Sequence, residues 1–177
     1  MADGKETESG THSAVPLKVS EMNWSAWSPT HHATLTFIQS GNQVLLIRKK
    51  RGLGDGLING PGGKLEKGES PAECAVREVE EEVGLTPLEM EERGELRFQF
   101  VDGYAIHVHI FVAKGHRGEL IETDEAIPIW FNQEDVPYDE MWDDDRLWLP
   151  HVLSGGSVEG DFIFDDREMV DYRLNCS

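Results

Sequence analysis

Short runs of β-branched, aromatic and aliphatic residues alternate with turn residues from position 32 onward, and this pattern predicts a chain built mainly from β-strands. The runs with the length and composition of strands are residues 32–39, 43–48, 95–101, 104–113, 127–131, 158–164 and 169–174. Ser40-Gly41-Asn42 separates the first two runs, and Asp102-Gly103 joins the third to the fourth. Because such residues favour tight turns, both pairs are expected to form hairpins, and so are the last two runs.

Residues 71–83 have the pattern of an amphipathic helix. Ser70 and Glu73 form a capping-box sequence, and Pro71 occupies the first helical position, which proline favours. Gly84 stands where a left-handed residue ends a helix. The apolar residues of one face, which we expect to lie against the sheet, are Ala72, Ala75, Val76, Val79 and Val83.

Two further segments complete the predicted organisation. Residues 139–153 have apolar positions at helical spacing, with an interruption expected at Pro150. The first 16 residues are polar, so we expect a disordered tail over residues 1–20. The remaining residues, 21–177, have the length of one domain.

Three carboxylates cluster on a second face of the predicted helix. Glu78, Glu81 and Glu82 are spaced i, i+3 and i+4, so they fall within about 100° of arc and are neighbours. Like charges at this spacing cost roughly 0.2–0.5 kcal/mol per pair on an exposed helix. Such a face is either solvated or holds cations, and clustered oxygen ligands suit Mg²⁺ or Mn²⁺. Glu69 just before the helix adds a further carboxylate.

The surrounding residues favour the cation. Gly60-Pro61-Gly62-Gly63-Lys64 precedes the helix, followed at fixed spacing by Glu69, Arg77-Glu78-Val79, Glu81-Glu82 and Gly84-Leu85. Counted from Gly63 to Leu85, the nine fixed positions over 23 residues resemble the Nudix box of the Nudix hydrolases. The resemblance implies an α+β fold, an α/β/α sandwich around a mixed central sheet with a strand-loop-helix-loop motif. It also implies metal-dependent cleavage of a nucleoside diphosphate linked to another group.

The resemblance also implies roles for individual residues. Metal ligands are expected at the Gly62 carbonyl, Glu78 and Glu82, with Glu81 as a further ligand or the residue that deprotonates water. Arg77 is expected to orient the glutamates through ion pairing, with Glu69 in the same catalytic group. The identity of the general base stays open. The implied cofactor is Mg²⁺, with Mn²⁺ as a substitute.

Residues outside the box resemble one branch of the family, the animal-type MutT-like enzymes that hydrolyse oxidised purine nucleoside triphosphates. The matching segments are Lys49-Lys50-Arg51-Gly52, Asn59-Gly60, Phe98-Gln99-Phe100-Val101, Thr123-Asp124-Glu125 and Met141-Trp142-Asp143-Asp144-Asp145. The resemblance implies hydrolysis to the nucleoside monophosphate and pyrophosphate, which would cleanse the nucleotide pool.

This branch implies a base pocket and further contacts. The base is expected to stack on Trp142 and to hydrogen-bond Asn59 and the pair Asp144 and Asp145, one of which can donate if burial keeps it protonated. Glu125 matches a further metal-coordinating glutamate. The other residues expected to contact substrate are Leu53, Lys50, Lys64 and Phe98.

Charge and composition limit the partners. With 16 Lys and Arg against 34 Asp and Glu, the formal net charge is −18, which argues against a nucleic-acid polymer or an anionic membrane surface as partner. Two cysteines are too few for a disulfide framework, and no apolar run approaches the ~20 residues that span a bilayer. We therefore expect a cytoplasmic monomer or small homo-oligomer whose partner is a nucleoside triphosphate bridged by metal.

Alternative interpretations remain at this stage. The chain could be a Nudix enzyme for another pyrophosphate, such as a dinucleoside polyphosphate or ADP-ribose, or a nucleotide-binding module without activity. Convergence of Asn59, Trp142, Asp144 and Asp145 in one pocket near Glu82 would favour the oxidised-purine interpretation. His107 and His109 share one strand face and resemble a metal pair, but a hydrogen-bonded or solvated face is the favoured interpretation.

Overall fold

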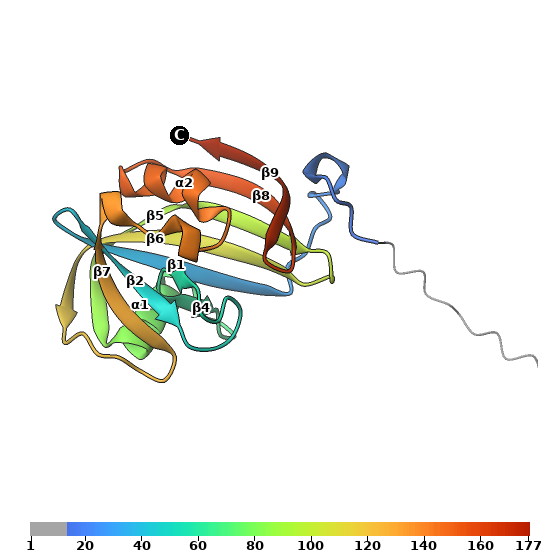
Figure 1. Ribbon diagram of the computed structural model, residues 1–177. Helices are drawn as coiled ribbons and strands as arrows, with labels where there is room; N and C mark the ends of the chain where they lie inside the picture. Colours follow the sequence, from blue (N-terminus) through green and yellow to red (C-terminus); the bar gives the residue numbers. More distant parts are fainter. Residues whose placement is uncertain (1–13) are drawn as a thin grey trace, which may run out of the picture.

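Nine strands form one mixed sheet in the computed structural model, which describes residues 14–177 (Figure 1). The strands are β1 (His31–Ser40), β2 (Gln43–Lys49), β3 (Ile58–Asn59), β4 (Gly62–Lys64), β5 (Leu85–Phe100), β6 (Ala105–Gly118), β7 (Ala126–Asn132), β8 (Val158–Asp165) and β9 (Glu168–Cys176). Their order is β3-β2-β1-β6-β5-β8-β9, with β4 paired to β1 and β7 paired to β2. The pairs β1·β6 and β5·β8 are parallel and the others antiparallel, so the sheet is mixed as expected.

Alternate residues of the strands feed two separate cores. In β2, Val44 and Leu46 face one core while Leu45 and Ile47 face the other. Helix α1 (Pro71–Val83) covers the second core, and α2 (Asp145–Leu153) covers the first from the other side of the sheet (Figure 1). The sandwich of helix, mixed sheet and helix is therefore confirmed.

Helix α1 begins and ends where the sequence predicts. Ser70 Oγ accepts a hydrogen bond from the Glu73 amide at 3.2 Å, and Glu73 Oε2 accepts one from the Ser70 amide at 2.8 Å. Gly84 ends the helix in the left-handed region at φ 77°. The buried face differs from the apolar stripe: Ala72 is exposed, whereas Glu82 is buried. The helix is thus rotated so that one of its carboxylates turns inward.

Two elements differ from the expected boundaries. Strand β5 begins at Leu85 rather than near residue 95, because its first half pairs with the extended end of β6 across a bulge between Glu92 and Gly94. The expected helix over 139–153 is shorter, since a 3-10 turn at Tyr138–Glu140 precedes α2. Pro150 lies inside α2 and does not interrupt it.

The N-terminal segment is ordered earlier than expected. Residues 1–13 of the predicted tail lie outside the described residues. A 3-10 turn, η1 (Val19–Glu21), includes the expected boundary at residue 20, and the buried Val19 donates its amide to Asp171 Oδ2 at 2.8 Å. Trp24 Nε1 in turn donates to the Val19 carbonyl at 2.8 Å. Within residues 14–177, every helix is too short or too polar to cross a bilayer.

Candidate active site

One cavity of about 500 Å³ brings together most of the residues that the sequence singles out. The predicted residues that line it are Leu53, Asn59, Gly62, Lys64, Arg77, Glu78, Glu82, Phe98, Glu125, Trp142, Asp144 and Asp145. Three predicted residues do not line it: Lys50, Glu69 and Glu81. The carboxylates of α1 form one end of the cavity, and aromatic side chains with the aspartate pair form the other.

Glu82 is the most deeply placed carboxylate at the acidic end. Its side chain turns toward strand β4, where the Gly62 amide donates to Oε2 at 3.1 Å. Because it is only 3% exposed, burial raises its pKa to about 8, against the attraction of Lys49, which lowers the pKa. A buried carboxylate with one backbone donor is poorly compensated as an anion, so a cation beside it would be stabilised.

Glu78 lies directly against the glycine pair that precedes the helix. A Cβ atom on Gly63 would lie 2.4 Å from the Glu78 carboxylate, so only glycine leaves room for this side chain. Burial also raises the pKa of Glu78, with Glu81 and Glu125 adding to the shift. A Cβ on Gly62 would instead meet the Thr34 carbonyl oxygen at 1.9 Å. Gly63 thus leaves room for the Glu78 carboxylate, and Gly62 leaves room for the backbone of the neighbouring strand β1.

Arg77 holds the carboxylates of the motif in place. Its Nε and Nη2 donate to the two oxygens of Glu69 at 2.7 and 2.9 Å, and Nη1 donates to Glu78 at 2.8 Å and Glu81 at 3.1 Å. Nη2 also donates to the Lys64 carbonyl at 3.0 Å, which ties α1 to β4. The ion pairs hold the pKa of Glu69 down to about 2. The expected ion pairing is therefore present, with Glu69 and Glu81 outside the cavity lining.

The donor set at this end fits a hard divalent cation. The Glu82 anion is disfavoured by both Glu78 and Glu125, so three carboxylates repel one another within one water-accessible cavity. Arg51 pairs with Glu125 and offsets part of this charge. Oxygen ligands in such an arrangement are those that Mg²⁺ and Mn²⁺ prefer.

The opposite end presents aromatic surface. Trp142 lies edge-on to Phe164, with ring centroids 5.5 Å apart, and edge-on to Phe100 at 6.2 Å. Phe98 is partly buried against the same core and stacks on Phe162 at 5.1 Å, yet it also lines the cavity. Packing on several sides holds the Trp142 ring in place, which suits stacking of a planar base.

Two buried aspartates face this aromatic end. Asp144 and Asp145 are each 2% exposed. Trp148 Nε1 donates to Asp144 Oδ2 at 2.8 Å, and the Trp142 amide donates to Asp145 Oδ2 at 3.1 Å. Burial and the proximity of the second carboxyl raise the pKa of Asp145 well above its usual range, and burial also raises that of Asp144. The pair therefore favours a state that keeps a proton, which gives the cavity a donor beside an acceptor.

The basic residues of the cavity are not the ones that the sequence singles out. Lys50 turns away and donates to Glu122 at 2.5 Å and to the Thr123 carbonyl at 2.7 Å. Its neighbours Lys49 and Arg51 line the cavity instead. Strand β2 ends at Lys49, so Lys50 and Arg51 follow the path of the loop beyond it rather than the alternation of a strand. The run of four basic residues at positions 48–51 does not reveal where the strand ends.

Other cavity residues lacked any signal. Tyr104, just before β6, and Phe164, in β8, come from different parts of the chain and line the cavity together because β5 pairs with both β6 and β8. Trp148 is fully buried in the core, and it contributes to the cavity wall as well.

Comparisons with known proteins agree with this geometry. The NUDIX domain model matches residues 29–152. A protein of Danio rerio called oxidized purine nucleoside triphosphate hydrolase is 39% identical over 77% of this chain and 88% of its own length. Its Mus musculus namesake is 37% identical over the same shares. The crystal structure of a mutator MutT protein from Bacillus halodurans superposes with a TM-score of 0.74 and 31% identity, over 82% of this chain and 97% of that one.

Proposed function

Because this chain belongs to the Nudix family, we propose that it hydrolyses oxidised purine nucleoside triphosphates to the monophosphate and pyrophosphate. The observation that carries the proposal is the convergence of Asn59, Trp142 and the Asp144–Asp145 pair in the cavity that also contains Glu82. Two relatives that match most of this chain bear the name of that activity, which supports the substrate class.

Mg²⁺ is the proposed cofactor, held by the carboxylates of Glu78, Glu82 and Glu125 and by the Gly62 carbonyl, with Mn²⁺ as a substitute. A divalent cation bound there neutralises phosphate oxygens and lowers the pKa of a coordinated water. Glu81 does not line the cavity, but it accepts a hydrogen bond from Arg77, which does. We therefore assign Glu81 and Glu69 to positioning, through the guanidinium that also orients Glu78.

The chain's own cations complete the phosphate end. Lys49, Arg51 and Lys64 line the cavity and supply positive charge for a triphosphate. Of the three, Lys49 attracts the Glu82 anion and Arg51 pairs with Glu125. In-line attack on phosphorus depends on position and charge stabilisation more than on covalent catalysis, which fits a site without a partnered nucleophile.

The purine end supplies selectivity. A purine stacked on Trp142 presents its edge to Asp144 and Asp145, and Asn59 offers both a donor and an acceptor. An aspartate that keeps its proton donates to an acceptor on the oxidised base, while the ionised partner accepts from a ring N–H. A site that hydrogen-bonds one group strongly rejects an analogue that lacks it.

The test is a substrate panel with an isosteric variant. Wild type and Asp144→Asn are assayed for pyrophosphate release from oxidised and normal purine nucleoside triphosphates at saturating Mg²⁺, and for AMP release from ADP-ribose under the same conditions. Asp143→Asn is the matched control because Asp143 is the exposed neighbour. We expect wild type and control to prefer an oxidised purine and Asp144→Asn to alter that preference. Equal rates on all normal nucleotides, or a preference for ADP-ribose, would overturn the proposal.

A further inference from the structure

Three histidines gather on the sheet face that points away from the purine end of the cavity. In β6, Ile106 and Val108 line the cavity, so the alternate residues His107 and His109 point to the opposite face. Strand β1 pairs with β6 in parallel and places His32 directly opposite His107. The pair His107 and His109 on β6 thus lies beside a third imidazole, that of His32, which precedes His107 by 75 residues in sequence.

The three imidazoles lie within reach of one ion. One ring nitrogen from each of His32, His107 and His109 lies within 4.8 Å of the others. The ring centroids of His107 and His109 are 4.9 Å apart, and those of His32 and His107 are 5.2 Å apart. A His-x-His pair on one strand with a histidine on its neighbour supplies the three-nitrogen ligand set of zinc sites that keep a fourth position open.

Two glutamates contact the rings of His107 and His109 and fix their orientation. Glu95 Oε2 lies 2.8 Å from His107 Nε2, and Glu92 Oε1 lies 2.8 Å from His109 Nδ1. These contacts confirm the hydrogen-bonded face that the sequence favours. Each contact uses one of the two ring nitrogens, and we assign the other to the metal. Histidine ligands of metals nearly always donate their second N–H to a carboxylate or carbonyl in this way.

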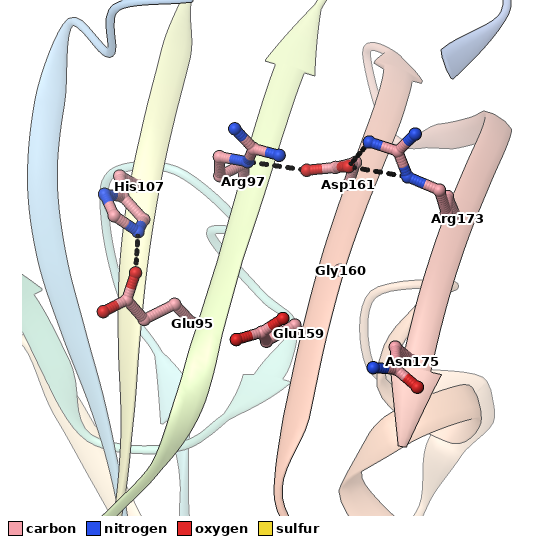
Figure 2. A pocket seen from close by; sticks show the side chains of 8 residues that line it. All are labelled: Glu95, Arg97, His107, Glu159, Gly160, Asp161, Arg173 and Asn175. Carbon is pink, nitrogen blue, oxygen red and sulfur yellow. Dashed lines mark hydrogen bonds and ion pairs between the residues drawn. The ribbon is translucent and has the colours of Figure 1, made fainter. Parts of the chain in front are cut away.

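The surroundings also favour a cation. The side chains of His107 and His109 are 18% and 13% exposed, and each lies against a glutamate. His107 and Glu95 border a hollow of about 420 Å³. Arg97, Asp161 and Arg173 line the same hollow, and Figure 2 shows both arginines paired with Asp161. Asp161 offsets one of the two guanidinium charges, and Glu95 and Glu159, which line the same hollow, outweigh the other.

We propose that His32, His107 and His109 bind a Zn²⁺ ion, at a site separate from the carboxylates of the cavity. Imidazole nitrogens suit zinc, whereas the oxygen ligands of the cavity suit magnesium, so the two sites differ in metal class. Glu92 and Glu95 act as hydrogen-bond partners that orient the ligands. Bound zinc joins β1 to β6 and thereby stabilises the fold.

The test measures zinc binding to the full chain by calorimetric titration. Saturating Mg²⁺ occupies the carboxylate site throughout. We expect one tight zinc equivalent in wild type, and affinity at least about ten-fold weaker in His32→Ala and His109→Ala. His116→Ala is the matched control, since His116 is an exposed histidine near the other end of β6. Wild-type zinc affinity in both cluster variants would overturn the proposal.

Two further readouts separate this site from the cavity. Glu82→Gln should bind zinc as wild type does, and loss of the tight equivalent in that variant would assign it to the cavity and refute the proposal. Zinc should also raise the melting temperature of wild type and of His116→Ala but not of His32→Ala. An equal rise in His32→Ala would contradict the assignment.

Discussion

Gly63→Ala separates the position of a catalytic carboxylate from the stability of the fold. The added Cβ would lie 2.4 Å from the Glu78 carboxylate, while ordinary contacts begin near 3.4 Å. The carboxylate must therefore retreat by about 1 Å, and it is the end of a side chain that can move. Gly63 does not have the positive φ that alanine would resist, so the backbone is not strained.

The expected result is a folded protein with a displaced Glu78. A misplacement of about 1 Å at a reacting centre can cost roughly 10²-fold in rate, so kcat for pyrophosphate release should fall by about that factor. The melting temperature should change little. An added methyl group costs about 1–3 kcal/mol of stability in a closed core, where no neighbouring group can move, whereas here the Glu78 carboxylate can move. Both quantities are measured on the same preparation.

Gly62→Ala provides the contrasting control. Its Cβ would lie 1.9 Å from the Thr34 carbonyl oxygen, which is backbone of β1 and cannot retreat without breaking the pairing of β1 with β4. This variant should lose stability as well as activity. Wild-type kcat in Gly63→Ala, or a loss of stability equal to that of Gly62→Ala, would refute the reasoning.

Three other substitutions test the remaining parts of the site. Glu82→Gln should lower kcat by about 10²-fold or more. Without metal, its melting temperature should equal that of wild type below pH 4.5 and exceed it above pH 8. The reason is that the pKa of Glu82 is raised to about 8 in the fold, so the wild-type anion destabilises the folded state at high pH. Asp144→Asn should flatten the pH dependence of KM, which in wild type should rise with pH as the buried pair loses its proton. Arg77→Lys should lower kcat about 10–100-fold with little change in melting temperature, because it loses the two-pronged contact to Glu69. Unchanged kinetics, pH profiles or melting curves would contradict each in turn.

The local parts of the fold were predictable because their signals lie within a few residues. Ser70, Glu73 and Gly84 specify both ends of α1, and Asp102-Gly103 specifies the turn between β5 and β6. The expected boundaries failed where long-range pairing decides. Residues 85–94 form a strand only because the far end of β6 lies beside them, and Pro87 with the acidic residues around it hides this from local pattern.

The same division applies to the site. Helical spacing brought out Glu78, Glu81 and Glu82 because they belong to one helix, and of these Glu81 does not line the cavity. Arg77 came from the resemblance to the Nudix box. The end of β2 at Lys49 and the path of the loop after it decided that Lys49 and Arg51, rather than Lys50, line the cavity. His32, the third histidine of the proposed zinc site, could not be predicted, because only the parallel pairing of β1 with β6 brings it beside His107.

The most direct test of the proposed function compares kcat/KM for 8-oxo-dGTP and dGTP by pyrophosphate release, with Mg²⁺ and with EDTA. The proposal predicts a preference for the oxidised nucleotide of about ten-fold or more, since one selective hydrogen bond worth ~1.4 kcal/mol corresponds to a factor of ten. It also predicts that the products are pyrophosphate and the corresponding nucleoside monophosphate, 8-oxo-dGMP or dGMP, and that no turnover occurs in EDTA. Equal kcat/KM for the two nucleotides, or turnover that survives EDTA, would contradict it.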